Sequence, residues 1–208
     1  MISVSLSRMR IRIYVSLLVL AASPLFLQAF WQVFRNFNVR DYHWLVLTAI
    51  TLITVPVFFV LPGVLTVVTI GDAFVIAICM LHGTPRAIIA NTLYMTVLTL
   101  LVHSKNKTKP HRIIFNIATA VLNASLYGYV FHALNATGSS RLEDLVLPTF
   151  AVAITFFLSN SLFVAAAVAL SSGKSLLAVW RANYFRLSLD FLVSACAAAF
   201  IVLFREYQ

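Results

Sequence analysis

Charged side chains are scarce in this chain of 208 residues. They make up 10% of it, whereas hydrophobic residues make up 62%. Soluble domains contain about 25% charged residues, because polar groups must cover their surface. No stretch outside the apolar blocks is long enough to bury a core of its own. The composition therefore excludes a soluble globular fold or a separate soluble domain.

Cysteine and catalytic motifs are also sparse. Cys79 and Cys196 lie in different apolar blocks without a CxxC pattern, so we expect two buried small side chains and no disulfide. The five histidines fall at block ends without ligand spacing, so we expect no metal and no other cofactor. The chain contains no serine nucleophile elbow, Walker sequence or carboxylate pair. We therefore expect that it is not an enzyme.

The chain is rich in long stretches of apolar residues. Seven of them are long enough to cross a hydrocarbon core of about 30 Å. They cover approximately 11–34, 43–61, 64–82, 86–103, 113–134, 145–170 and 185–204. Barrel strands would alternate in segments of about ten residues, and these blocks do not. The sequence thus predicts an all-α fold, a polytopic transmembrane helical bundle of about seven spans that forms one domain over 1–208.

The basic residues orient these spans. Lysine and arginine number 15 against six acidic residues, which gives a net charge of +9. With seven spans, three basic segments share one side, which the positive-inside rule assigns to the cytoplasm. These residues are Arg8, Arg10 and Arg12, then Lys105, Lys107, Lys109 and Arg112, then Lys174, Arg181 and Arg186. We expect a cytoplasmic N-terminus and contact with anionic membrane lipids, not with nucleic acid.

Asp72 is the most conspicuous polar residue within an apolar block. It lies near the start of the predicted span 64–82, where an ionised carboxylate in hydrocarbon costs several kcal/mol. Two roles are open and do not exclude each other. The carboxylate could cap the helix and complement its dipole, or it could bind a ligand or a cation in a cavity.

Several asparagines also lie within apolar blocks. Asn116, Asn123 and Tyr127 are spaced by seven and four residues and form one stripe on a helix, and Asn91 and Asn160 lie in neighbouring spans. Because an unpaired amide in hydrocarbon is costly, Asn116 and Asn123 should face protein. They could hold helices together or line a small-molecule cavity.

Arg186 and Asp190 are four residues apart in the last predicted span, so both project from one helix face. They could form an ion pair near the cytoplasmic interface, or Asp190 could face the centre of the bundle as part of a polar site. Alanine runs at 165–167 and 197–199 predict close approach of helices.

Short motifs in a fixed order give the chain a resemblance to a known family. They are Leu61-Pro62-Gly63, Thr69–Phe74, Leu81–Pro85, Arg112–Asn116, Phe156–Ser161 and Ser175–Arg181. Over roughly 45–200, the chain resembles the N-terminal membrane module of bacterial HD-GYP and GGDEF cyclic-di-GMP signalling proteins. More loosely, it is similar to the S components of energy-coupling-factor vitamin transporters. The chain itself contains no output domain, and seven spans place its C-terminus outside.

The resemblance implies a sensory input module in the bacterial cytoplasmic (inner) membrane. Such a module would bind a small hydrophobic molecule or a lipid between its helices, through Asp72, Asn116, Asn123 and Asn160, and signal to a cytoplasmic domain or partner. The alternative is an S-component-like subunit that binds a vitamin-like solute for transport. That subunit would dock to an energising membrane partner, for which the alanine runs could provide the surface.

Overall fold

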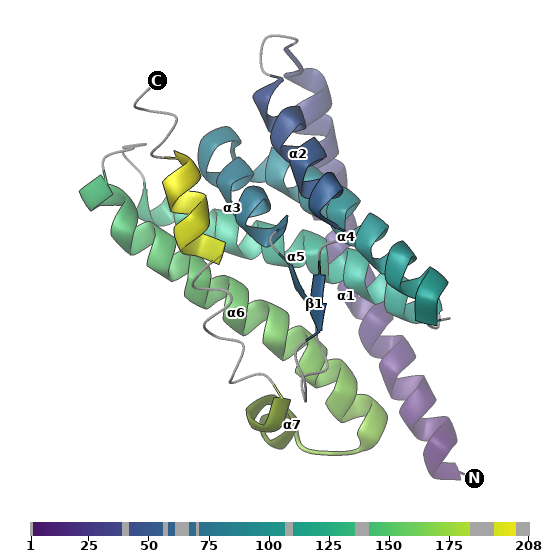
Figure 1. Ribbon diagram of the computed structural model, residues 1–208. Helices are drawn as coiled ribbons and strands as arrows, with labels where there is room; N and C mark the ends of the chain where they lie inside the picture. Colours follow the sequence, from purple (N-terminus) through teal and green to yellow (C-terminus); the bar gives the residue numbers. More distant parts are fainter. Residues whose placement is uncertain are drawn as a thin grey trace.

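The computed structural model describes residues 2–38, 42–55, 58–60, 67–69, 71–106, 110–135, 142–183 and 194–202. Most of these residues are helical (Figure 1). The elements are α1 (Ile2–Arg35), α2 (His43–Thr54), β1 (Phe58–Val60), β2 (Val67–Thr69), α3 (Gly71–His82), α4 (Thr84–Asn106), α5 (Pro110–Leu134), α6 (Leu142–Ser172) and α7 (Leu176–Asn183). Residues 194–202 form a further short helix.

Four helices are long and apolar enough to cross a membrane. Their apolar parts are Met9–Arg35, Thr84–Val102, Pro110–Leu134 and Asp144–Ser172. At 1.5 Å per residue, even the shortest, with 19 residues, reaches about 28 Å, close to the thickness of a hydrocarbon core. The structure thus confirms the predicted helices over 11–34, 86–103, 113–134 and 145–170. The chain is an integral membrane protein.

The second and third predicted spans are not continuous helices. α2 and α3 have 12 residues each, and β1 and β2 pair as an antiparallel hairpin between them, with Phe58 opposite Thr69. The prediction of helix throughout 43–61 and 64–82 is wrong for this hairpin. Pro56 follows α2 and lacks a backbone donor, and the strands consist of aromatic and β-branched residues, which favour extended backbone.

The seventh predicted span is described only in part. Residues 194–202 are helical, and the rest of the predicted range 185–204 lies outside the described residues. The structure therefore supports four long spans and does not confirm a count of seven.

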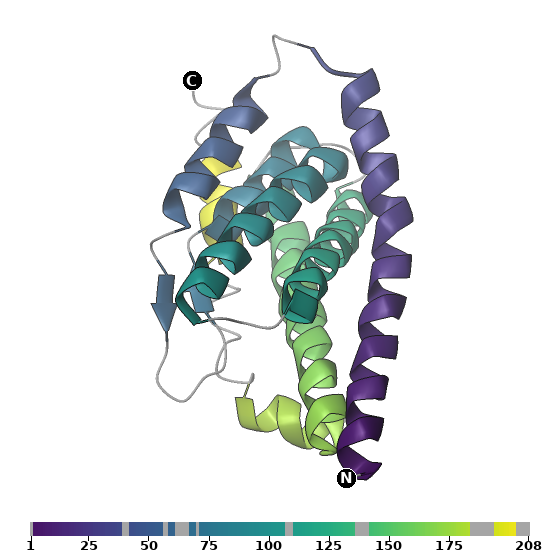
Figure 2. The same cartoon turned by 90° about the vertical axis from the view of Figure 1, so that its right-hand side faces the viewer.

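α5 is the central helix of the bundle and packs against α1, α4 and α6. Small residues allow this close packing: Ala124 is fully buried, and a Cβ at Gly128 would collide with the side chain of Thr84 at the start of α4. α1 runs along one side of the molecule (Figure 2), and its outer face exposes large apolar residues such as Leu20 and Phe34. These side chains are suited to contact lipid tails.

The described parts of the basic segments lie near a few elements of the bundle. Arg12 of α1 and His111 at the start of α5 line the same groove. The Tyr14 hydroxyl donates to the Phe163 carbonyl of α6 at 3.1 Å, and α6 continues from there towards α7. The N-terminal end of α1 and α7 lie at the same end in both views (Figures 1 and 2). That the basic segments share one side, and that this side is the cytoplasm, stay predictions, because several of their residues lie outside the described part of the chain.

Candidate functional site

The predicted amide stripe faces neighbouring helices. Asn116 Nδ2 donates to Thr99 Oγ1 of α4 at 3.2 Å, and Asn123 Nδ2 donates to Asn160 Oδ1 of α6 at 3.1 Å. The prediction that Asn116 and Asn123 face protein is confirmed. The two amides bond to different helices, so the stripe divides between the α4 and α6 interfaces of α5.

The α4–α5 interface uses its amides as structural links. Asn91 Nδ2 donates to the Ala120 carbonyl at 2.9 Å, and Asn91 is buried. Together with the Asn116–Thr99 bond, this gives α4 and α5 two polar links along one interface. Links of this kind contribute around 0.6 kcal/mol each in membrane helices. Asn91 and Asn116 therefore serve helix packing.

The α5–α6 interface differs, because two buried polar atoms there have no hydrogen-bond partner among the described residues. Asn123 is 3% exposed and Tyr127 is 1% exposed. Among the described residues, neither Asn123 Oδ1 nor the Tyr127 hydroxyl has a hydrogen-bond partner. The two side chains are four residues apart and lie on one face of α5. We call Asn123, Tyr127 and Asn160 the α5–α6 cluster.

Aromatic packing holds the cluster in place. The Tyr127 ring meets the Phe156 ring of α6 edge-on, with the centroids 5.6 Å apart. Phe156 and Asn160 are four residues apart on α6, opposite Tyr127 and Asn123. The positions of these side chains are thus fixed by two pairs of contacts between antiparallel helices. A rigid acceptor and a rigid hydroxyl are the groups from which a specific binding site is built.

Asp72 lies near the cluster, in the first turn of α3, and its side chain is half-buried. This is the end of a helix where a carboxylate complements the dipole, as the capping role requires. Asp72 also lies within electrostatic range of the Tyr127 hydroxyl. The neighbouring Gly71 packs on the Tyr94 ring of α4, where a Cβ would lie 2.6 Å from ring carbons. α3 therefore begins beside α4.

The remaining predicted residues are not brought together with this cluster. Arg186 and Asp190 lie outside the described residues, so their ion pair stays a prediction. Cys79 is buried, with its sulfur 3.9 Å from Thr84 Oγ1, as expected of a small core residue. Cys196 is exposed, so the prediction that it is buried is wrong: it lies on the outer face of its helix. In the part of the chain that the structure describes, no group of three His, Cys, Asp or Glu residues could hold a metal ion.

Two features were missed at the level of sequence. Tyr127 belongs to the stripe, but its hydroxyl was not counted with the binding groups; its spacing of four from Asn123 is the signal. The second is a link at the basic end: Trp180 Nε1 of α7 donates to Ser161 Oγ of α6 at 2.8 Å. Ser161 directly follows Asn160, but no sequence pattern pairs a tryptophan with a serine 19 positions away.

The chain was compared with protein-family models, curated proteins and solved structures, and none of them matches it.

Proposed function

We propose that this protein is a membrane-embedded input module. In this proposal it binds a small molecule or lipid at the α5–α6 cluster and passes the signal to a cytoplasmic output domain or partner. The observation that carries the proposal is the pair of buried atoms, Asn123 Oδ1 and the Tyr127 hydroxyl, that have no hydrogen-bond partner in the part of the chain that the structure describes. Leaving such an atom unpaired costs about 1–3 kcal/mol. A ligand that bonds to both atoms would recover this energy, and its binding would favour the helix arrangement that presents them.

The ligand class follows from these two groups. Asn123 Oδ1 accepts a hydrogen bond, and the tyrosine hydroxyl can donate one or accept one. The surroundings are apolar and aromatic, with Phe156 against Tyr127. We therefore expect a compact, mainly apolar molecule with at least one N–H or O–H group. Asp72 would favour a positive charge on the part of the ligand nearest α3.

The route from the cluster to the output side is short. Asn160 bonds to α5, and the next residue, Ser161, accepts the hydrogen bond from Trp180 of α7. α7 lies at the basic end, which the positive-inside rule assigns to the cytoplasm. A shift of α6 relative to α5 would therefore move the position of α7. This helix is the part of the molecule that we assign to output.

The test compares two tyrosines on α5. Tyr127→Phe removes only the buried hydroxyl, and Tyr129→Phe does the same at a position that is 76% exposed. Purified protein in nanodiscs is screened for thermal stabilisation by a panel of metabolites and lipid extracts. We expect a compound that stabilises the wild type and Tyr129→Phe, and has no effect on Tyr127→Phe.

The stability of the unliganded variants provides the second readout. Without ligand, Tyr127→Phe should be as stable as the wild type or more so, because an unpaired hydroxyl is removed. A loss of about 1 kcal/mol or more would mean that the hydroxyl serves the fold. That result, or a panel without any stabilising compound, would count against the proposal.

The transporter alternative needs a surface of small residues for a membrane partner. Of the two alanine runs, Ala165 and Ala198 are fully buried within the bundle, and the other four alanines are half-buried. The two buried alanines already serve packing inside the chain, which reduces the surface left for a partner, so we favour the input module. Uptake of a labelled solute by reconstituted vesicles, with and without a candidate energising partner, distinguishes the two functions.

A further inference from the structure

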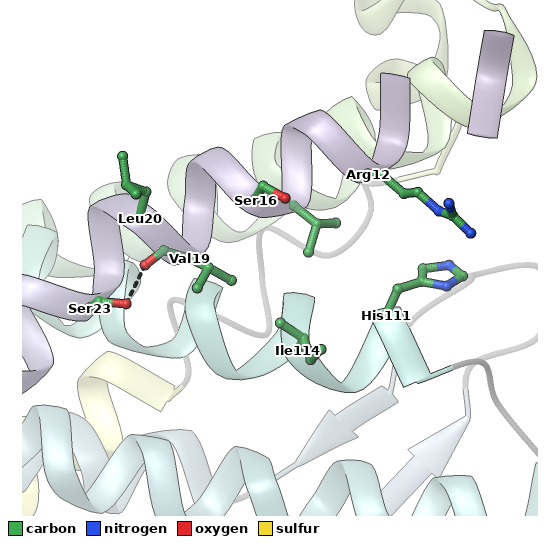
Figure 3. A pocket seen from close by; sticks show the side chains of 8 residues that line it. Arg12, Ser16, Val19, Leu20, Ser23, His111 and Ile114 are labelled. Carbon is green, nitrogen blue, oxygen red and sulfur yellow. Dashed lines mark hydrogen bonds between the residues drawn. The ribbon is translucent and has the colours of Figure 1, made fainter. Parts of the chain in front are cut away.

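A second candidate site lies away from the α5–α6 cluster, in a groove between α1 and α5 (Figure 3). Its volume is about 530 Å³, and it is open on one side. Arg12, Val15, Ser16, Val19, Leu20 and Ser23 contribute from α1, and His111 and Ile114 from α5. The α1 positions follow the i, i+3, i+4, i+7 spacing of a single helix face, so the groove runs along the helix.

The two ends of the groove differ in charge. The Arg12 guanidinium and the His111 ring lie at the same end (Figure 3). Arginine carries a permanent positive charge and a planar set of donors that suits phosphate. At the other end, the Ser23 hydroxyl already donates to the Val19 carbonyl at 2.7 Å. That end therefore offers mainly apolar surface, including Leu20, which is 75% exposed.

The length of the groove is close to the hydrocarbon thickness of one membrane leaflet. Ser23 follows Arg12 by 11 positions, which is about 16.5 Å along a helix. Half of a hydrocarbon core of about 30 Å is about 15 Å. With Arg12 at the membrane interface, the apolar end reaches the bilayer midplane. A molecule that fills this groove has an anionic head and an apolar tail of leaflet length.

We propose that the α1–α5 groove binds an anionic glycerophospholipid from the leaflet at the basic end of the bundle. The phosphate accepts hydrogen bonds from Arg12 and His111. One acyl chain lies along Val15, Val19 and Ile114. None of the eight lining residues is acidic, and the exposed Arg112, next to His111, adds positive charge close to the same end. This charge complementarity favours a lipid anion over an apolar helix of a partner protein.

The test counts retained lipids by native mass spectrometry. Protein is taken from nanodiscs that contain equal amounts of phosphatidylglycerol and phosphatidylcholine. The wild type should retain one phosphatidylglycerol in preference to phosphatidylcholine. Arg12→Gln should lower this retention about tenfold, whereas Arg10→Gln should change it less than twofold, because Arg10 does not line the groove. Equal losses in both variants would indicate a general surface charge effect and overturn the proposal.

The acyl-chain contact is tested separately. Ile114 is 49% exposed, so Ile114→Trp can fill the groove without a change of charge or of the core. This variant should lose the preferential retention of phosphatidylglycerol while it keeps its helix content by circular dichroism. Unchanged retention would overturn the assignment of the groove to the acyl chain. Displacement of the lipid by millimolar inorganic phosphate would indicate a site for the free anion and would also overturn the proposal.

Discussion

At the scale of single residues, the buried polar groups of α5 fall into two kinds: those with a hydrogen-bond partner on a neighbouring helix and those without one among the described residues. Asn91 and Asn116 each donate to a partner on the neighbouring helix, so their cost of burial is offset. Asn123 Oδ1 and the Tyr127 hydroxyl lack such a partner among the described residues. An apolar side chain of similar shape would avoid this cost. This difference is the reason why we propose the α6 side of α5 as the ligand-binding face.

Gly128 tests how closely α5 approaches α4. Gly128→Ala should destabilise the protein by about 1–3 kcal/mol, because the added methyl would overlap the Thr84 side chain. The measurement is the free energy of unfolding in mixed micelles. In a Thr84→Ala background the cost should fall, since two of the overlapping atoms are absent. Additive effects of the two substitutions would contradict the contact.

The role of Asp72, either helix capping or ligand binding, can be tested by removing its charge. Asp72→Asn should lower the free energy of unfolding by about 1 kcal/mol or less, because asparagine retains most of the hydrogen bonding at a helix start. Asp144→Asn, in the first turn region of α6 and exposed, is the matched control and should have a similarly small effect. A lost response to a stabilising ligand, with unchanged stability, would place Asp72 in the binding site instead.

At the scale of elements, the indole of Trp180 gives α7 a polar link to the bundle, beside the buried Val179. Trp180→Phe removes the Nε1–H donor to Ser161 but keeps an aromatic ring against Phe157, whose centroid lies 5.9 Å away. We expect a loss of about 0.6–1 kcal/mol and faster hydrogen exchange in Leu176–Asn183. Trp31→Phe, at an exposed position of α1, should leave both quantities unchanged. Unchanged exchange in Trp180→Phe would mean that other contacts hold α7.

The sequence predicts an element correctly where the length of an apolar block alone determines its secondary structure. Length and apolarity predict α1, α4, α5 and α6, because only a helix can satisfy the backbone along so long an apolar block. The same criterion failed around β1 and β2, since three aromatic or β-branched residues are as apolar as a helical turn.

For the site, periodicity predicted the common face of Asn123 and Tyr127. It could not predict that Asn160, 37 residues away, bonds to Asn123, because the register between two helices depends on the packing of both.

At the scale of the whole molecule, the basic residues at one end predict the orientation in the membrane. Single cysteines at Arg112 and Arg181 should react with an impermeant thiol reagent from the same, cytoplasmic side, and one at Phe37 should react from the other. Cys196→Ser removes the exposed native thiol, and Cys79 can stay because it is buried. Labelling of Arg112→Cys and Arg181→Cys from opposite sides would refute the arrangement, and labelling of both from outside would invert it.

The two short helices on either side of the hairpin also constrain how the chain enters the membrane during synthesis. α2 and α3 each reach about 18 Å, so neither can be released into the bilayer as an independent span. Both pack against α4, which is synthesised after them. We therefore expect α2 and α3 to be held stably in the membrane only after α4 has been synthesised and can pack against them.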